Sequence, residues 1–256
     1  MRWHKINAMV YRDFKIFTRV KYKSVEFFYF PTITVLIWGL FSIYAQQFWF
    51  EAGMIILVIN MFWSFAHLAQ SEVNILMMED VWSGSIKQML VSGLTSFEYL
   101  FARLISVGII SIVVTTLLII LSSFFVVFPN YIDLVLLVIP TLVGSMALSG
   151  IVGALIMRLG REYGFLAWTS ISLLIFLSAP FFPLEFFPFV LQMLAKIMPF
   201  TYIFAGAREL MTTGSVQNVY ILKSYLIAFI YLILSLLIYY FSFEKAREDG
   251  KLARFF

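Results

Sequence analysis

The sequence predicts an all-α polytopic membrane protein with six transmembrane helices, for two reasons. The chain of 256 residues is 62% hydrophobic and only 12% charged, with a mean hydropathy of +0.95, which excludes a water-soluble globular domain. It also contains six apolar stretches of about the 20 helical residues that cross a hydrocarbon core. These stretches are residues 25–45, 52–70, 99–128, 134–157, 163–180 and 220–241. We therefore expect a single transmembrane domain over residues 1–256.

Positive charges are distributed unevenly between the two sides that these spans define. With the N-terminus inside, fifteen Lys and Arg residues fall on the inner side, and only Lys196, Arg208 and Lys223 fall on the outer side. Because inner loops of membrane proteins carry the excess of Lys and Arg, we expect a multi-pass protein of the cell membrane with both termini in the cytoplasm. This topology explains the net charge of +4, so nucleic acid is not an expected partner.

Residues 1–24 precede the first span and are predicted to form an amphipathic helix on the membrane surface. Phe14 and Phe17 alternate with Arg12, Lys15 and Arg19. A basic helix with an aromatic opposite face binds the interface of anionic lipid, so membrane lipid is an expected partner. The alternative is a charge cluster that only sets the topology.

The second span carries a polar residue, Asn60, at mid-depth. A polar group at the bilayer centre is costly unless it meets another helix or a water-filled path. Asn60 is therefore predicted either to bond a neighbouring helix or to line a path. The chain has no cysteine and two histidines, so we expect no metal site.

Residues 71–98 form the main expected loop, on the cytoplasmic side. Within it, Ile86, Met89 and Leu90 recur at helical spacing with polar residues between them, which predicts a short amphipathic helix. Gly93 is a suitable C-terminal stop for this helix. It is too short and too polar to cross the membrane, so it lies on the membrane or docks into a partner.

The segment 180–200, between the fifth and sixth spans, contains four prolines among Phe and Leu residues: Pro180, Pro183, Pro188 and Pro199. Four prolines cannot be part of one regular helix. We expect one or two short re-entrant helices that dip into the outer leaflet and return. Residues 201–211 are then expected to run along the outer surface, with Arg208 and Glu209 toward water.

In this order, these elements resemble the membrane subunits of type-2 ABC exporters over essentially the whole chain. The family shows a charged pair, then Gly-Thr, an aliphatic residue, Glu, Leu and Ser/Thr-Pro in its inner loop. Here Ser85 stands for the Thr, Lys87 for the Glu and Gly93 for the Pro. The inner-loop residues that carry the resemblance are Glu79, Asp80, Trp82, Gly84, Ser85, Ile86, Lys87, Gln88, Met89, Leu90 and Ser92. The second matching part is residues 182–188 followed by residues 198–202.

The resemblance implies a permease that dimerises, with an identical chain or a paralogue, and takes its energy from a separate ATPase subunit. ATP and magnesium are then expected on that ATPase, and no cofactor in this chain. The sequence agrees, since it has no Gly-x-x-x-x-Gly-Lys-Ser/Thr phosphate loop. We therefore do not expect an enzyme.

In the family, the inner-loop helix inserts into a groove of the ATPase. The resemblance assigns this coupling role to Glu79, Asp80, Trp82, Gly84, Ser85, Ile86, Lys87, Met89 and Leu90. Its apolar members, Trp82, Ile86, Met89 and Leu90, would supply anchors. Its charged members, Glu79, Asp80 and Lys87, would set register. The alternative is an amphipathic loop on the membrane surface.

The transport path is expected between two protomers, along the first, second and fifth spans. Candidate lining residues are Asn60, Phe62, Trp63, Thr169, Ser172 and Phe176. The expected outer gate is Pro183, Glu185, Pro188 and Pro199, a pattern that equally suits a structural lid. Because no carboxylate or Arg is expected at mid-depth in these spans, a lipid-like, drug-like or lipid-linked glycan substrate fits best.

Two other classes of function remain open. A secondary transporter would show internal repeats or acidic residues at mid-membrane, and neither is evident between residues 25–128 and 134–241. An intramembrane enzyme would need a catalytic cluster, but no Gly-x-Ser-x-Gly setting or aspartyl pair is present. An assembly factor is a further alternative.

Overall fold

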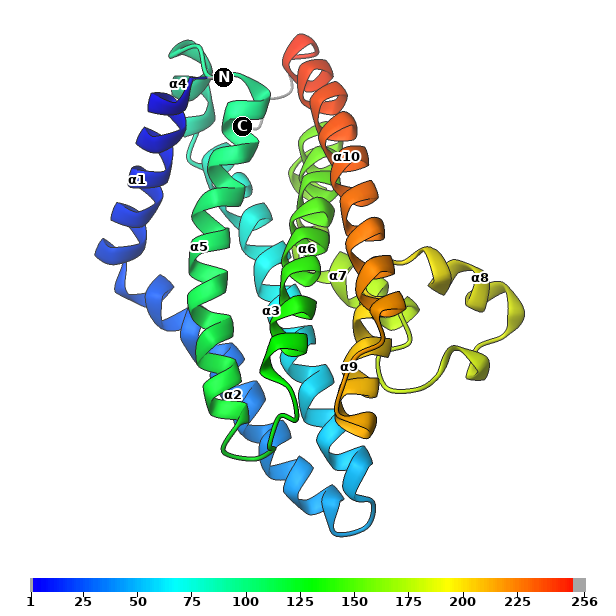
Figure 1. Cartoon of the computed structure of the whole chain (residues 1–256). Coiled ribbons are helices and arrows are strands. Elements are labelled where there is room, and N and C mark those ends of the chain that lie inside the picture. The colour runs from blue at the N-terminus through cyan, green and yellow to red at the C-terminus, as the bar shows by residue number, and fades with distance from the viewer. Residues whose placement is uncertain (1, 251–256) are drawn as a thin grey trace.

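The computed structural model describes residues 2–250, and within them every regular element is helical (Figure 1). The elements are α1 (Trp3–Arg19), α2 (Lys21–Gln46), α3 (Phe50–Trp82), α4 (Ser85–Val91), α5 (Ser96–Ser122), α6 (Tyr131–Leu159), the 3-10 helix η1 (Arg161–Phe165), α7 (Leu166–Leu177), the 3-10 helix η2 (Leu184–Phe186), α8 (Phe189–Ile197), α9 (Thr201–Thr213) and α10 (Asn218–Glu248). Figure 1 shows the start of α1 and the end of α10 at the same end of the bundle. We call it the terminal end, and the opposite one the distal end.

Within residues 2–250, five helical segments are long and apolar enough to cross a membrane, which confirms the polytopic all-α class. They are Phe27–Gln46, Phe50–Trp82, Ser96–Ser122, Tyr131–Leu159 and Asn218–Glu248. The expected fifth span, residues 163–180, is instead a shorter apolar helix over Glu162–Leu177. Backbone breaks bound it: Gly160 has φ of 109° before it, and Ala179 has φ of 48° after it, directly before Pro180.

The proline-rich segment divides into short helices, as the prolines predict. Pro183 precedes η2, Pro188 precedes α8, and Pro199 lies in the break between α8 and α9. Helices α8 and α9 are bent by 92° at this break, the geometry of a broken span or a re-entrant loop. Figure 1 shows α8 (yellow) projecting away from the bundle.

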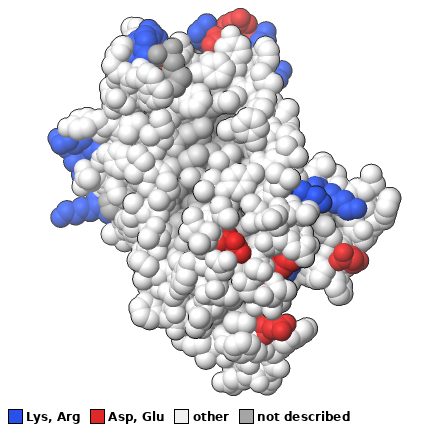
Figure 2. All heavy atoms as spheres, viewed as in Figure 1, with Lys and Arg blue, Asp and Glu red and all other residues white. Residues whose placement is uncertain are grey.

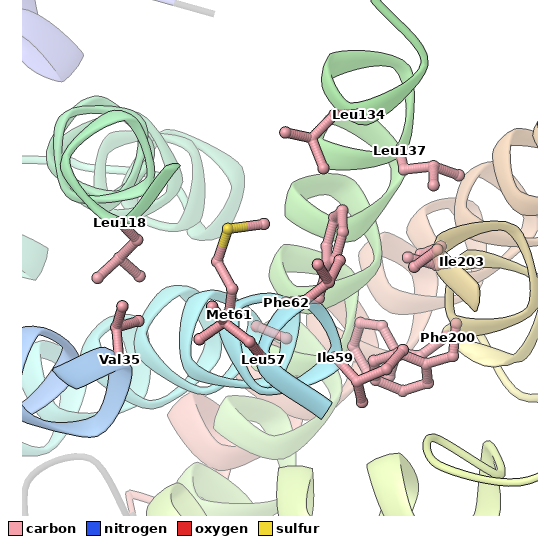
Figure 3. Close-up of a cluster of buried hydrophobic side chains, with 14 of the residues drawn as sticks. Val35, Leu57, Ile59, Met61, Phe62, Leu118, Leu134, Leu137, Phe200 and Ile203 are labelled. Atoms are coloured by element: carbon pink, nitrogen blue, oxygen red, sulfur yellow. The ribbon is translucent and has the colours of Figure 1, made fainter. Parts of the chain in front are cut away.

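Helix α9 does not run along the surface as expected but forms part of the core. Ile203, Phe204, Ala207 and Leu210 are all buried on one side of it. Apolar residues at this helical spacing favour burial over a surface position. Figure 3 shows side chains of α2, α3, α5, α6 and α9 pointing toward one another in the core, with Phe62 near its middle.

The expected loop over residues 71–98 is mostly helical, which corrects that prediction. Helix α3 continues to Trp82 and α5 begins at Ser96, so the connection is only residues 83–95. The helix continues because residues 71–82 contain no Gly or Pro and because Val73, Met77 and Val81 recur at helical spacing and are buried. It ends where Gly84 adopts φ of 71°, a conformation that favours glycine.

Two close junctions fix the arrangement of the helices. A Cβ atom at Gly150 of α6 would lie 2.1 Å from Ser235 Oγ of α10, so glycine leaves room for the Ser235 hydroxyl where these two long helices pack closely. At the start of the chain, Val20 is the only residue between α1 and α2. The orientation of α1 is therefore tied closely to that of α2.

Candidate functional site

A buried charge cluster joins four helices at the terminal end. Its centre is Arg103 of α5, whose side chain is fully buried. Arg103 Nη1 donates to Asp13 Oδ1 of α1 over 2.6 Å, and Nη2 forms an ion pair with Asp80 Oδ2 of α3. The guanidinium also lies over the ring of Tyr99, 5.3 Å from its centroid. One arginine thus ties α1 and α3 to α5.

Further donors satisfy the two carboxylates. Asp80 accepts hydrogen bonds from Tyr99 Oη (2.8 Å), from Ser85 Oγ at the start of α4 (3.0 Å) and from Arg12 Nη2 (2.9 Å). Asp13 accepts from Ser106 Oγ over 2.8 Å and from Arg12 Nη2 over 3.2 Å. A buried ion pair is strongly disrupted when one partner is lost, because the other charge stays buried without compensation. We therefore expect these groups to act as one rigid unit.

A second set of contacts holds the other end of α4. Lys5 Nζ donates to the carbonyls of Ser92 (2.6 Å) and Gly93 (3.1 Å), and Arg2 Nη2 donates to the Gly93 carbonyl. Cations suit this position because a helix C-terminus carries partial negative charge. Arg2 also pairs with Glu98 over 2.9 Å, and Glu98 forms a capping box with Thr95 at the start of α5. Helix α1 thus holds the C-terminal end of α4, while Asp80 of α3 holds its start through Ser85.

The residues predicted to contact an ATPase divide into buried and exposed sets. Ile86 is only 1% exposed and packs with Ile6, Met9 and Val81, and Met89 and Leu90 pack partly against the same cluster. The apolar face of α4 is thus turned toward its own bundle, and Ile86 contacts that bundle and is not exposed at the surface. The side chains that α4 and its flanks expose include Trp82, Lys87, Gln88 and Val91, with Ser83 and Ser92.

The predicted charges also have intramolecular roles. Asp80 is buried in the charge cluster, and Glu79 pairs with Lys23 of α2. Ser85 bonds Asp80, and Gly84 makes the turn between α3 and α4. These four residues therefore place α4 on the bundle. Gly93, with φ of 72°, ends α4 as predicted.

Sequence reasoning missed the partners Asp13, Tyr99, Arg103 and Ser106. Two signals could have found them. Arg103 lies inside the apolar stretch 99–128, and a charge in such a stretch usually has a specific partner. Asp13 is the only acidic residue among the first 25, which makes it the natural partner from the N-terminal region.

Two hollows lie along one side of α3. The first, of about 480 Å³, lies toward the terminal end between α2, α3 and α7, and we call it the terminal hollow. It is lined by Phe30, Pro31, Thr34, Trp63, Ser64, His67, Leu68, Ser71, Glu72, Ile75, Trp168 and Ser172. Two of the predicted path residues, Trp63 and Ser172, are among them. The three helices are those expected to line the path.

The second hollow, of about 640 Å³, lies toward the distal end, and we call it the distal hollow. It is lined by Trp38, Trp49, Glu51, Ala52, Ile55, Ile56, Phe181, Pro183, Arg208, Glu209 and Thr212. Of the predicted gate residues, Pro183 is at this hollow. Glu185 and Pro188 are exposed around η2 and α8, and Pro199 is buried at the break before α9.

The structure places the other predicted path residues outside both hollows. Phe62 is 1% exposed in the core, and Asn60 donates to the Ile56 carbonyl of its own helix over 2.8 Å. Thr169 is exposed on α7 and bonds the carbonyl one turn before it. Phe176 is half exposed and contacts Phe187, with ring centroids 5.9 Å apart.

Charged side chains are sparse on the visible surface of the bundle. In Figure 2 the basic side chains gather at the terminal end, along the edge formed by α1, and toward α8, while acidic side chains lie at the terminal end, near α8 and at a few places over the lower half of the bundle. The long helices between them present a mostly uncharged surface in this view. This distribution suits a body embedded in lipid, with water at its ends.

The sequence matches the model of a known protein family. A family model described as the ABC-2 type transporter matches residues 4–212, which include the charge cluster, α4 and both hollows. No curated protein matches the chain.

Proposed function

The chain belongs to the ABC-2 type transporter family and is the membrane subunit of an ABC transporter, and on this premise we propose that it works as an exporter driven by a separate ATPase subunit. ATP and magnesium are bound by that ATPase. Under this proposal the terminal end faces the cytoplasm, where ATP is available, and the protein resides in the cell membrane. The chain contributes the substrate path and the surface on which the ATPase acts.

The observation that carries the proposal is the way α4 is held. A helix of seven residues is too short to be stable alone, so its neighbours set its position. Ser85 ties its start to Asp80, and Lys5 ties its end to α1. The charge cluster then joins α1, α3 and α5. A displacement of α4 by a partner is therefore passed to three long helices together.

The surface that meets the ATPase is the exposed part of α4 and its flank, namely Trp82, Lys87, Gln88 and Val91. Val91 is 89% exposed, and an aliphatic side chain so exposed at the end of a short helix is a suitable anchor for a partner groove. Trp82, the last residue of α3 before the turn into α4, is 40% exposed. This set replaces the apolar face that the sequence indicated.

A second permease chain, identical or a paralogue, would complete the path. Both hollows are open on one side; the terminal hollow lies between α2, α3 and α7, and the distal hollow lies between α2, α3 and the segments after α7. A partner packed against this side would enclose them. Their lining combines aromatic rings and hydroxyl groups with a few charged side chains, Glu72 in the terminal hollow and Glu51, Arg208 and Glu209 in the distal hollow, which fits an amphipathic substrate.

The test is co-purification in mild detergent from native membranes, comparing wild type with Val91→Glu. We expect a nucleotide-binding ATPase, identified by mass spectrometry, with wild type and not with Val91→Glu. The matched control is Val127→Glu, because Val127 is 82% exposed in the turn between α5 and α6 at the distal end. Control and wild type should recover the ATPase equally.

Other outcomes have distinct meanings. Recovery of the ATPase with both variants would still support an ATPase-driven permease, but it would show that the ATPase contact does not include Val91. No ATPase with wild type, from membranes where the protein is abundant and folded, would favour an autonomous transporter. Ile86→Glu is unsuitable here, since it would place a charge in the buried cluster.

A further inference from the structure

The two hollows lie along one continuous face of the bundle. On α3 the lining runs from Ala52 and Ile56 to Trp63, His67 and Ser71, a spacing that keeps residues on one side of a helix. On α2 the lining runs from Pro31 and Thr34 to Trp38 in the same way. Ile56 and Trp63 are seven residues apart, or roughly 10 Å along the axis. The hollows are therefore successive parts of one route, with a short separation.

An aromatic pair stands at this separation. Trp63 lines the terminal hollow and Phe181 lines the distal hollow. Their ring centroids are 6.3 Å apart with an angle of 31° between the ring planes, within the range in which aromatic rings attract. Trp63 is on the long helix α3, whereas Phe181 is in the non-helical segment after α7. Phe181 is thus the member of the pair that can move.

The backbone that carries Phe181 is strained. Among the described residues, Ala179 is the only non-glycine residue with positive φ, at 48°. This conformation is unfavourable for alanine, because Cβ approaches the following carbonyl oxygen. Such strain persists only where the surroundings hold it. Ala179 is also fully buried, so a specific contact is needed to keep the turn in place.

Arg208 of α9 provides that contact. Its Nη1 donates to the carbonyl oxygens of Ala179 and Pro180, each over 2.7 Å. Hydrogen bonds from a charged donor are stronger than neutral ones. Helix α9 is packed in the core, so Arg208 holds the turn from a fixed position. The two carbonyls directly precede Phe181.

We propose that Arg208 is a positioning residue that keeps Phe181 against Trp63 and so closes the route between the two hollows. When Arg208 releases the two carbonyls, the strain at Ala179 favours a different turn and Phe181 leaves Trp63. This inference rests on the proposed function in one respect, that substrate moves along this face. It names a gate that differs from the expected set of prolines and Glu185.

The test measures the access of a thiol reagent to the terminal hollow from the distal side. The chain has no cysteine, so Ser172→Cys gives a single reporter in that hollow. A membrane-impermeant maleimide is applied to intact cells, which expose the distal side in the proposed orientation. We expect slow labelling with Arg208 present and labelling about tenfold faster or more with Arg208→Gln, since two charge-assisted bonds are lost.

Three further variants separate gating from damage to the fold. Lys196→Gln changes an exposed cation of α8 that lines neither hollow, and it should leave the labelling rate unchanged. Phe181→Ala, with Arg208 intact, should raise the rate as Arg208→Gln does, because it removes the ring itself. Ala179→Gly added to Arg208→Gln should return the rate toward that of the wild type, because glycine adopts the turn without strain. A loss of fold would not follow this pattern.

The labelling rate from the terminal side is measured in inverted vesicles, and it should be the same for every variant. If Ser172→Cys is reached equally fast from the distal side with and without Arg208, the gate is disproved while the path stands. If it is reached from neither side in any variant, the path along this face is disproved, while coupling to an ATPase is decided separately by the co-purification test.

Discussion

Two buried or partly buried arginines, one toward each end of the bundle, hold the structure in different ways. Arg103 lies between the carboxylates of Asp13 and Asp80, with no exposure to solvent. Arg208 binds two neutral backbone carbonyls and also lines an open hollow. When Arg103 is removed, two negative charges remain buried. When Arg208 is removed, the carbonyls it leaves are neutral groups close to a hollow. The contacts of Arg103 are therefore costly to break, whereas the contacts of Arg208 can be released so that the turn opens.

The largest expected effect is that of Arg103→Met, which removes the cation from the buried charge cluster. The carboxylates of Asp13 and Asp80 would lose their shared cation, so we expect the free energy of unfolding to fall by about 3–5 kcal/mol. The measurement is denaturant unfolding of the protein in detergent. Arg247→Met is the control, since Arg247 is exposed and pairs with Glu244 of the same helix, and it should change stability by less than about 1 kcal/mol. Equal effects of the two variants would show that the cluster is not a fixed unit.

An intermediate effect is expected from Gly93→Ala, which tests how precisely the end of α4 is held. A Cβ atom there would meet only ordinary contacts, the nearest being Lys5 Nζ at 3.5 Å. The cost therefore comes from φ of 72°, and we expect a loss of about 1–2 kcal/mol. Gly93→Asn should cost less, since asparagine tolerates this conformation better. The measurement is thermal unfolding of both variants. A larger loss of stability for Gly93→Asn than for Gly93→Ala would indicate crowding of the side chain instead of backbone strain.

The smallest effect, of opposite sign, is expected from Ala179→Gly with Arg208 intact. Glycine relieves the strain of the turn but adds freedom to the unfolded chain, so we expect a gain of up to about 1 kcal/mol. Ala8→Gly, at an exposed position of the regular helix α1, should instead lose about 1 kcal/mol. Thermal unfolding compares them. A loss at both positions would mean that Ala179 is not strained, and the contrast between the two arginines would weaken.

Helices with strong local signals could be predicted from the sequence. The long apolar runs predicted most of the spans, and the prolines predicted the breaks around α8. Gly93 predicted the end of α4, because glycine has a direct link to a left-handed turn. The prediction of a loop over residues 71–98 was wrong, because polar residues such as Ser71 and Asn74 suggested a position at the surface. Both are buried on α3, in a helix that extends beyond the usual length of a span.

The rest depended on contacts between distant residues. Apolar spacing showed that Ile86 lies on an apolar face but not that this face packs on its own bundle. Asp13 and Arg103 are far apart in the chain, so their pairing could not be deduced from either residue alone. Ala179 has no feature in its residue type that indicates a left-handed backbone. The gate proposed for Phe181 and Arg208 therefore came only from the structure.

The single residue between α1 and α2 gives the charge cluster an effect on distant parts of the molecule. Helix α2 has 26 residues, or roughly 39 Å of length at the usual rise per residue. A rotation of only about 5° at Val20 would move the far end of α2 by roughly 3 Å over that length. A small angular change at α1, fixed by Asp13, is thus geometrically amplified beside Trp38 and the distal hollow.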